Sequence, residues 1–517
     1  MTATTKTGNA PGSGGNVLSA LDAKVPTSFL WSLTLLATIG GFLFGYDTAN
    51  IGAALNLVPY PLTGLALGYL VSGASLGAAA GALAAGPLTD RFGRKSLLII
   101  DALIYAVGAI LSAVTPNAAI LLAARTLIGL AIGADSAIAT AYIAEYAPRG
   151  RRGSLSMLQQ WMITVGILGS YIVALVILSA WPHSAASSGW RLILGLGAVP
   201  AIVGFALRTK MPESPRWLMR HGKYDKARDA LGRLGVETTV DDVERTAGAV
   251  RLADVQQRTV RSRWTPGVRR ALIIVSVFFV LQQITGINVP LYYGPHLLGP
   301  LFQAGGGKVA TTIAGVEVTA IMTAVNVAAT YIGFRYIDKV GRRKISMAGY
   351  TGMAVSAVIA AIGLGFLDGT GRIVLVMVGL DIFIACFALG VGGTGWLIQG
   401  ESFPTAVRGR AAAIAASVDW LANFALIEAF PNMQSAIGVG WVLIVFAALC
   451  ALAITFIFLF LPETKGHSVE EITELFERPA RQAVSASLTR PSAVSRPAGV
   501  PQATAGVPLS GSDGGSG

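Results

Sequence analysis

Charged residues are scarce in this sequence. They make up 13% of its 517 residues, whereas hydrophobic residues make up 53%. A soluble domain carries about 25% charged residues, so this chain has too few to cover a water-facing surface. Apolar runs recur along nearly the whole length, and many approach the roughly 20 residues that cross a bilayer. The composition therefore excludes a string of soluble domains and predicts one bundle of membrane-spanning helices.

Cysteine is also nearly absent. The two cysteines, Cys386 and Cys450, both lie inside apolar segments, where they are typical of small buried hydrophobic side chains. No spacing of a zinc or redox site is present, so we expect neither a metal nor a cofactor. The N-terminus lacks the pattern of a signal peptide. We therefore interpret the first apolar run, which begins at Phe29, as the first membrane span.

Charges and prolines divide the apolar sequence into twelve runs, which predict an all-α membrane protein with two six-helix halves. The predicted spans are residues 29–50, 64–88, 97–115, 119–146, 154–180, 190–208, 268–298, 311–335, 345–366, 373–400, 410–430 and 437–461. The predicted organisation is an N-terminal tail (1–28), a first half (29–208), a polar linker with short amphipathic helices (209–267), a second half (268–461) and a largely disordered C-terminal tail (462–517).

The net charge of +12 has a topological explanation. The short loops on one side of the predicted bundle hold thirteen lysines and arginines, whereas those on the other side hold only Lys308 and Arg372, with Arg191 at a helix edge. Basic loops face the cytoplasm. We therefore expect a cell-membrane protein with both termini and the linker in the cytoplasm, in contact with lipid and with no nucleic-acid partner.

Three motifs occur twice, in the same order, at offsets of 248, 256 and 250 residues. The paired positions are Asp90 and Asp338, Glu145 and Glu401, and Pro212 and Pro462. Such regular repetition indicates that the two halves arose by duplication. Parallel six-helix repeats are the architecture of major facilitator transporters.

Acidic and basic residues of these motifs gather where the predicted helices reach the cytoplasm. Ion pairs between helices there would latch the inner gate of a transporter, although simple anchoring of positive loops would explain the same residues. The predicted gate residues are Asp90, Arg94, Glu145, Arg152, Asp338, Arg342, Glu401 and Arg408.

Ionisable residues inside membrane spans are candidates for function because they are costly there. Asp47 and Arg125 fall at compatible depths in the outer halves of their helices. An arginine would stabilise the ionised Asp47, and protonation would release the pair, which makes a proton switch; a structural ion pair is the alternative. Asp135 is either a second proton site or a carboxylate capped by the hydroxyls of Ser136 and Thr140.

A binding site for a polyhydroxylated ligand needs neutral donors and acceptors beside flat apolar faces. The seventh predicted helix offers Gln282, Gln283 and Asn288, with Gly286 and Pro290 able to break it nearby, and broken helices are typical of substrate sites in transporters. Further candidates on the eighth, tenth and eleventh helices are Asn326, Trp396 and Trp420. These amides could instead form hydrogen bonds between helices.

Six segments resemble the signature motifs of the sugar porter family. They are Gly45–Thr48, Asp90–Lys95, Pro212–Leu218, Gln282–Asn288, Gly400–Pro404 and Pro462–Gly466. The resemblance runs from residue 45 to residue 466 and implies the major facilitator fold. It also implies that Phe44, Gln160 and Trp396 belong to the substrate cavity. In this family an acid at the position of Asp47 marks proton symporters.

The sequence departs from the family pattern at the predicted cavity. Ile167 and Ala174 stand where the family has polar residues, Asp419 replaces the amide that usually precedes the tryptophan at 420, and Gly392–Gly393 replaces Gly-Pro. These changes fit a smaller polyol, a modified sugar or a cationic metabolite. Asp419 is accordingly a predicted substrate-binding residue, a second protonation site being the alternative.

The sequence thus predicts a secondary active transporter that imports a sugar or polyol with protons by alternating access, working as a monomer. An exporter of drugs or metabolites and an importer of a cationic metabolite are the alternatives, and a non-transporting sensor would need a larger signalling tail. Enzymatic activity is not expected. The Gly390–Gly395 run is similar to a phosphate-binding loop but lacks the strand that should precede it.

Overall fold

The computed structural model describes residue 17 and residues 28–146, 152–259, 264–302, 307–404, 407–467, 469–478 and 480–489. Within these residues the chain is helical and contains no strand, which confirms the predicted all-α fold. The predicted N-terminal tail lies almost wholly outside the described residues. The C-terminal tail, predicted to be largely disordered, is helical over residues 469–477 and 480–489 and lies outside the described residues from 490 on. Arg152 and Asp338 fall within helices, but their side chains are also outside what is described.

Each half of the chain is built from helices, most of them long. Those of the first half are α2 (Ser28–Ala37), α3 (Ile39–Ala54), α4 (Gly64–Phe92), α5 (Arg94–Val114), α6 (Ala118–Tyr146), α7 (Arg152–Ala180), α8 (Pro182–Ser184), the π-helical η2 (Ala185–Gly189), α9 (Trp190–Gly195) and α10 (Ala198–Arg208). Those of the second half are α14 (Pro266–Ile284), α15 (Asn288–Phe302), α16 (Lys308–Val340), α17 (Arg342–Phe366), α18 (Gly369–Gly390), α19 (Thr394–Ser402) and α20 (Arg408–Phe460). Between the halves lie α11 (Pro215–Arg220), α12 (Tyr224–Arg233) and α13 (Val240–Thr259), and α21 (Val469–Glu477) and α22 (Ala480–Thr489) follow them.

Eleven helical stretches of the described chain are long and apolar enough to cross a membrane, one fewer than the predicted twelve spans. The difference lies in α20, whose 53 residues would extend about 80 Å at 1.5 Å per residue, more than twice the thickness of a bilayer core. Gly438 interrupts it with φ of 78° and ψ of 156°, a left-handed conformation that glycine adopts readily. The eleven stretches therefore supply twelve crossings.

Several predicted spans are broken rather than continuous. The first consists of α2 and α3, the seventh of α14 and α15, and the tenth of α18 and α19. The seventh breaks at Gly286, where φ is 91°. Pro290 lies in the first turn of α15. A backbone N–H there would have no intrahelical partner, so proline costs the helix no hydrogen bond. Breaks in two helices of the second half expose backbone groups at the same depth.

Small residues let the helices approach closely. A Cβ atom on Gly129 would lie 1.8 Å from the carbonyl oxygen of Ala74, and one on Gly133 would lie 1.9 Å from that of Ala78. Helix α6 therefore packs against the backbone of α4, as small residues at regular spacing allow in membrane helices.

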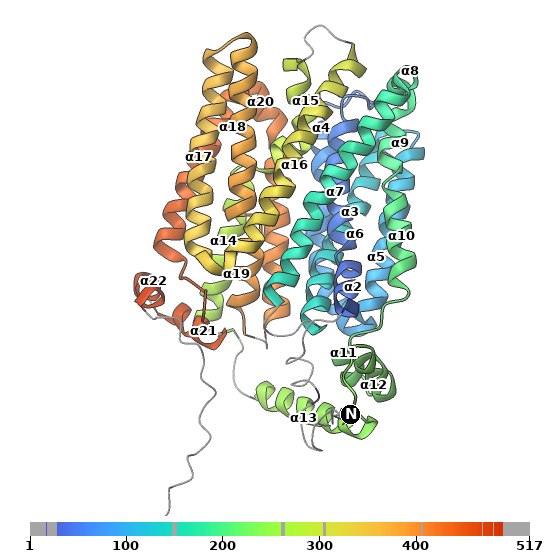
Figure 1. Cartoon of the computed structure of the whole chain (residues 1–517), viewed down its shortest axis with the longest axis vertical. Coiled ribbons are helices and arrows are strands. Elements are labelled where there is room, and N and C mark those ends of the chain that lie inside the picture. The colour runs from blue at the N-terminus through green and yellow to red at the C-terminus, as the bar shows by residue number, and fades with distance from the viewer. Residues whose placement is uncertain are drawn as a thin grey trace, which may run out of the picture.

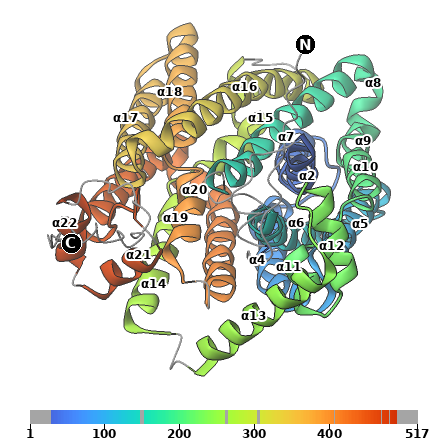
Figure 2. The same cartoon turned by 60° about the horizontal axis from the view of Figure 1, so that its bottom comes forward.

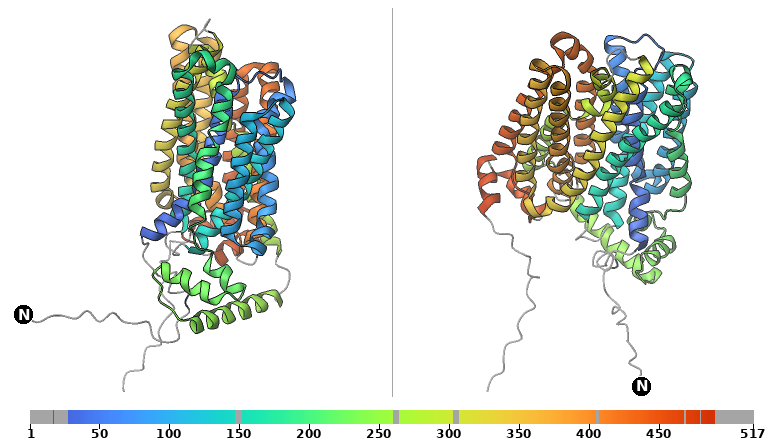
Figure 3. Two further views of the ribbon diagram at one scale, coloured as in Figure 1. Left: turned by 90° about the vertical axis from the view of Figure 1, so that its right-hand side faces the viewer. Right: turned by 45° about the horizontal axis from the view of Figure 1, so that its top comes forward.

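The two halves stand side by side (Figure 1), with α11, α12 and α13 beyond one end of the bundle. We call this end the linker end. Helices α21 and α22 lie toward it as well, and a view from that side shows α13 reaching from the first half toward α14 (Figure 2). The side views in Figure 3 show the same arrangement.

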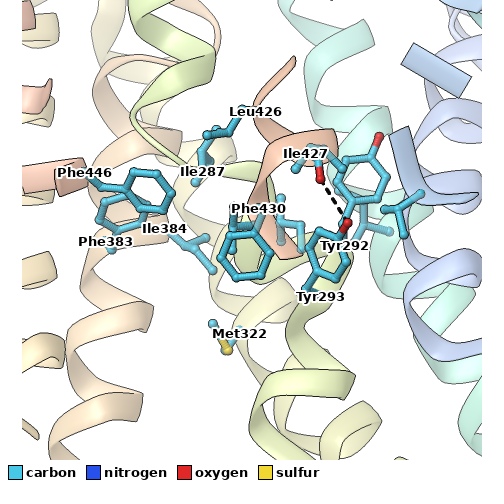
Figure 4. Close-up of a cluster of buried hydrophobic side chains, with 14 of the residues drawn as sticks. Ile287, Tyr292, Tyr293, Met322, Phe383, Ile384, Leu426, Ile427, Phe430 and Phe446 are labelled. Atoms are coloured by element: carbon cyan, nitrogen blue, oxygen red, sulfur yellow. Dashed lines mark hydrogen bonds between the residues drawn. The ribbon is translucent and has the colours of Figure 1, made fainter. Parts of the chain in front are cut away.

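A cluster of aromatic and branched side chains packs between helices of the second half (Figure 4). It includes Tyr293, whose hydroxyl donates a hydrogen bond of 3.0 Å to the carbonyl oxygen of Ile427, and Phe430, whose ring centroid lies 4.9 Å from that of Tyr293. Hydrogen bonds between the halves lie near the ends of the helices that are far from the linker. Ser72 donates to Glu428 at 2.7 Å, and the Tyr171 hydroxyl donates to the carbonyl oxygen of Leu291 at 2.6 Å. The halves are therefore joined at the end opposite the linker.

Candidate functional site

A cavity lies between the two halves at the level of the helix breaks. Its empty space amounts to about 750 Å³, a volume that includes space open to solvent. All nine predicted substrate-binding residues line it. They are Phe44, Gln160, Gln282, Gln283, Asn288, Asn326, Trp396, Asp419 and Trp420. The spacing and the resemblance had predicted these residues from six different helices, and the fold brings them to one place.

A chain of side-chain hydrogen bonds crosses the cavity wall. Gln283 donates to a carboxylate oxygen of Asp419 at 2.7 Å. Asn288 donates to the Gln283 side-chain oxygen at 2.8 Å and to that of Asn423 at 3.2 Å. Asn423 in turn donates to the Ser75 hydroxyl at 3.1 Å, in the other half of the molecule. The amides thus both face the cavity and connect helices. The predicted hydrogen bonds between helices are confirmed, and substrate binding by these amides stays a prediction.

Gln282 has a different environment from its neighbour Gln283. It is only 3% exposed, and its side-chain nitrogen donates to the carbonyl oxygens of Val391 and Gly392 at 3.3 and 3.0 Å. These carbonyls are freed where α18 gives way to α19. The side-chain oxygen of Gln282 is buried without a hydrogen-bond partner. Gln282 therefore anchors one helix break to another and keeps an acceptor at the cavity.

Aromatic rings supply the flat faces. The Phe44 and Trp420 rings pack edge to face with centroids 4.9 Å apart, and the Trp396 ring lies 5.2 Å from that of Phe279. The indole N–H of Trp420 is buried without a hydrogen-bond partner, although a buried indole N–H usually has one. A ligand hydroxyl could accept from it.

Four polar residues that the sequence reasoning missed also line the cavity. They are Thr48, Thr164, Thr330 and Asn423. Each lies four residues after a predicted site residue on the same helix, namely Phe44, Gln160, Asn326 and Asp419. Residues four apart share one face of a helix, so this spacing was a signal that the sequence contained.

Asp47 and Arg125 form an ion pair between α3 and α6. The Asp47 side chain is 2% exposed and that of Arg125 is not exposed at all, and Arg125 also donates to the carbonyl oxygen of Leu70 at 3.2 Å. Asp47 lies between Phe44 and Thr48 in sequence, and both of those line the cavity. The pair therefore lies directly behind the cavity wall, where a charge change would act on a helix that lines the cavity.

Asp135 belongs to a second buried ion cluster. It lies 2.5 Å from the guanidinium of Arg208, which is also 2.8 Å from Asp101. The predicted capping by hydroxyls is wrong, since Ser136 donates to the carbonyl oxygen of Gly133 and Thr140 to that of Ser136. Both partners were missed, although each is a charge within a predicted span. We call Asp101, Asp135 and Arg208 the Arg208 cluster.

The ion pairs seen among the described gate side chains join helices of the same half. Arg94 contacts Glu145 at 3.1 Å and Asp90 at 3.3 Å, and Arg342 contacts Glu401 at 2.7 Å. Arg408 donates to the carbonyl oxygen of Phe403 at 3.0 Å. In this conformation these contacts tie helices of one half to each other at the linker end.

Two glutamates of the repeated proline motifs were not predicted to have a role, yet each caps a helix. Glu213 accepts hydrogen bonds from the backbone N–H groups of Arg94 and Lys95 at 3.0 and 3.1 Å. Glu463 does the same for Arg342 and Arg343 at 2.9 and 3.1 Å. A carboxylate is favourable at the positive end of a helix, so the duplicated motif has a duplicated structural role.

Replacing Glu213 with glutamine is expected to lower the apparent melting temperature of the purified protein by about 1 °C, because losing a charged cap costs about 1 kcal/mol and the shift per kcal/mol is small in a chain of 517 residues. Fluorescence-detected thermal unfolding in detergent measures this shift. Glu237→Gln, a change at an exposed linker residue, is the matched control. Equal melting temperatures for the two variants would contradict the capping role.

Comparison with known proteins gives a consistent result. Residues 33–476 match the family model "Sugar (and other) transporter". The chain is 34% identical over 472 residues to the arabinose-proton symporter of Bacillus subtilis (strain 168), covering 89% of this chain and 99% of the symporter. It is also 34% identical to the D-xylose transporter of Levilactobacillus brevis, covering 87% and 95%. Among solved structures, a partially occluded inward-open conformation of the xylose transporter XylE from E. coli superimposes with a TM-score of 0.71 at 26% identity, covering 84% of this chain and all of that one.

Proposed function

The chain belongs to the sugar (and other) transporter family, and we propose that it imports a sugar or polyol together with protons by alternating access. It is a multi-pass membrane protein, with eleven helical stretches able to cross a bilayer in the described chain. The linker end carries the basic loops, so it is the cytoplasmic end in this proposal, with both termini on that side of the cell membrane. Because one chain encloses a complete cavity, the monomer suffices for transport.

The observation that carries the proposal is the buried Asp47–Arg125 pair behind the cavity wall. Ionised Asp47 neutralises Arg125, and an unpaired buried charge would cost several kcal/mol. A proton on Asp47 removes that neutralisation and changes which packing of α3 against α6 is preferred. Since Phe44 and Thr48 on α3 line the cavity, protonation and ligand contact act on one helix, which is what coupling requires.

The cavity chemistry supports a neutral hydroxyl-rich substrate. Gln283 and Asn288 present amide groups, and Phe44 and Trp420 present ring faces. Amides both donate and accept, which matches the hydroxyl groups of sugars. The arabinose-proton symporter and the D-xylose transporter, named above as relatives, act on pentoses according to their names, and a pentose is therefore the first substrate to test.

Uptake by purified protein in proteoliposomes tests the function. A panel of pentoses, hexoses and polyols is offered with an imposed proton gradient, with no gradient, and with a protonophore. We expect gradient-driven accumulation of at least one neutral sugar or polyol. Uptake by the wild type that ignores the gradient would refute symport. Movement of substrate out of the compartment into which protons flow, in place of uptake with the protons, would favour the exporter.

A cationic metabolite is the second candidate substrate, because Asp419 is the one ionisable side chain among the residues that line the cavity in the described chain. Asp419 already accepts a hydrogen bond from Gln283, which ties it to the amide network. Asparagine would keep that acceptor. We therefore expect Asp419→Asn to change the KM for a neutral sugar by less than about fivefold, since a neutral hydrogen bond contributes only about 1 kcal/mol.

Transport assays with Asp419→Asn separate the two substrates. An ammonium group loses a charged partner in this variant, which costs about 1.5–3 kcal/mol and would lower its uptake about 10- to 100-fold. Asp381→Asn changes a carboxyl that does not line the cavity and serves as control. A large loss confined to amines in Asp419→Asn would overturn the neutral-sugar assignment.

A further inference from the structure

The Arg208 cluster lies between Asp47 and the linker end. Asp101 is seven residues from the start of α5, about 10 Å along the helix, and Arg208 is the last residue of α10. Arg208 also donates to the carbonyl oxygens of Leu36 and Ala37, at 3.5 and 3.3 Å, where α2 gives way to α3. The cluster is therefore part of the interface that holds the first broken helix.

With both of its carboxyls ionised, the cluster has one more negative than positive charge. Two carboxylates share one guanidinium, and the side chains are at most 5% exposed. The Oδ2 atoms of Asp101 and Asp135 are both buried without a hydrogen-bond partner. Within the described chain the charged groups that act on the cluster are its own three members, while α2 and α3 contribute backbone carbonyls and Gly40. One proton would neutralise the cluster and give one orphaned oxygen a hydrogen to donate.

The cluster and the Asp47–Arg125 pair lie along the same two helices. A Cβ atom on Gly40 of α3 would collide with the Asp135 carboxyl, and Gly40 is two turns from Asp47, about 10 Å along the helix. On α6, Asp135 follows Arg125 by ten residues, about 15 Å. A change in the packing of α3 on α6 therefore reaches both sites.

Tyr105 stands between the two sites. Its hydroxyl is buried and donates to the carbonyl oxygen of Leu43, one turn before Asp47, at 3.1 Å. Leu43 lies on α3 between Asp47 and Gly40, the residue that packs against the Asp135 carboxyl. On α5, Tyr105 follows Asp101 by four residues, so the two side chains share one face of that helix. A hydroxyl group can accept a proton and donate another.

Resting on the proposed proton symport, we propose that the Arg208 cluster is a proton-acceptor site that receives, through Tyr105, the proton that Asp47 releases. The proton leaves the Asp47 carboxyl, the Tyr105 hydroxyl accepts one proton while donating its own, and a carboxylate of the cluster gains an O–H bond. The cluster changes from a net charge of −1 to neutral and returns the proton to water at the linker end. The number of protons per substrate is unchanged, since the two sites act in series.

Asp101→Asn and Tyr105→Phe test the relay in proteoliposomes. Asparagine leaves Arg208 paired with Asp135, and phenylalanine removes only the hydroxyl. We expect net proton-driven uptake of the transported sugar to slow at least tenfold in both variants. Exchange of labelled for unlabelled sugar, which needs no net proton release, is expected to stay within twofold of the wild type, as is the final level of accumulation. Asp381→Asn, a carboxyl outside the cluster, is the control.

Three results would overturn the relay. Net uptake and exchange that fall together would make the cluster structural, and net uptake equal to that of the wild type would leave it without a role. A lower final accumulation would mean that Asp101 helps to set the number of protons moved with each substrate molecule. Wild-type uptake that ignores the proton gradient would refute symport itself, a distinct outcome. Infrared spectroscopy gives an independent measurement: in an Asp47→Asn background, lowering the pH should still produce a protonated-carboxyl band, which Asp101→Asn should remove or shift.

Discussion

Replacing Asp47 with asparagine is expected to abolish concentrative uptake while sparing exchange of substrate. The wild type coupled to one proton can accumulate a neutral sugar about 50-fold at a membrane potential of 100 mV, because moving one charge through that potential supplies about 2.3 kcal/mol. Asparagine cannot take up the proton, so the variant should reach only equal concentrations on the two sides. Uptake and counterflow in the same proteoliposomes measure both quantities.

The variant should remain folded for a specific reason. Asparagine has nearly the shape of a protonated aspartate, and Arg125 keeps its hydrogen bond to the carbonyl oxygen of Leu70. A transport cycle that protonates Asp47 passes through the same unpaired arginine. If the single variant is nevertheless too unstable, Asp47→Asn with Arg125→Gln removes both charges and should show the same loss of accumulation with exchange retained. Concentrative uptake by either variant would remove Asp47 from the coupling role.

The sequence was most informative where a motif has one physical interpretation. Charge scarcity predicted the membrane bundle, and the Asp90 and Asp338 repeats predicted two halves. The amides among the nine predicted cavity residues were recognised because polar side chains are unusual inside membrane spans. The family resemblance added Phe44, Gln160 and Trp396, and the departure from its pattern added Asp419. All of them are local features of single helices, and the fold then determines only that these helices face one another.

Pairing between distant charges was harder to predict. Asp135 was recognised as unusual, but its partner Arg208 ends another helix, 73 residues later. Nothing local to Asp135 distinguishes a partner on α10 from the hydroxyls next to it. The partners of the gate residues were equally hard to predict. A repeated motif shows that Arg94 and Glu145 have counterparts in the second half, but it does not show that the two residues contact each other. Helix packing decides these partners.

Gln283→Ala is expected to raise the KM for the transported sugar about 10- to 100-fold and to leave the melting temperature within about 3 °C of the wild type. Gln283 donates to Asp419 and accepts from Asn288, so it is central to the amide chain that faces the cavity. Its loss removes a ligand contact and leaves a buried carboxylate without its donor, together about 1.5–3 kcal/mol. The cavity admits water, which limits the cost to the empty protein.

The adjacent Gln282→Ala is the matched comparison, because the two glutamines differ in what they hold. Gln282 donates to the carbonyl oxygens of Val391 and Gly392 at a break between helices. Removing it leaves these carbonyls unsatisfied away from water, so the melting temperature should fall together with transport. A lower melting temperature for Gln283→Ala than for Gln282→Ala would reverse the two roles. An unchanged KM in Gln283→Ala would show that the amide chain connects helices without contacting the sugar.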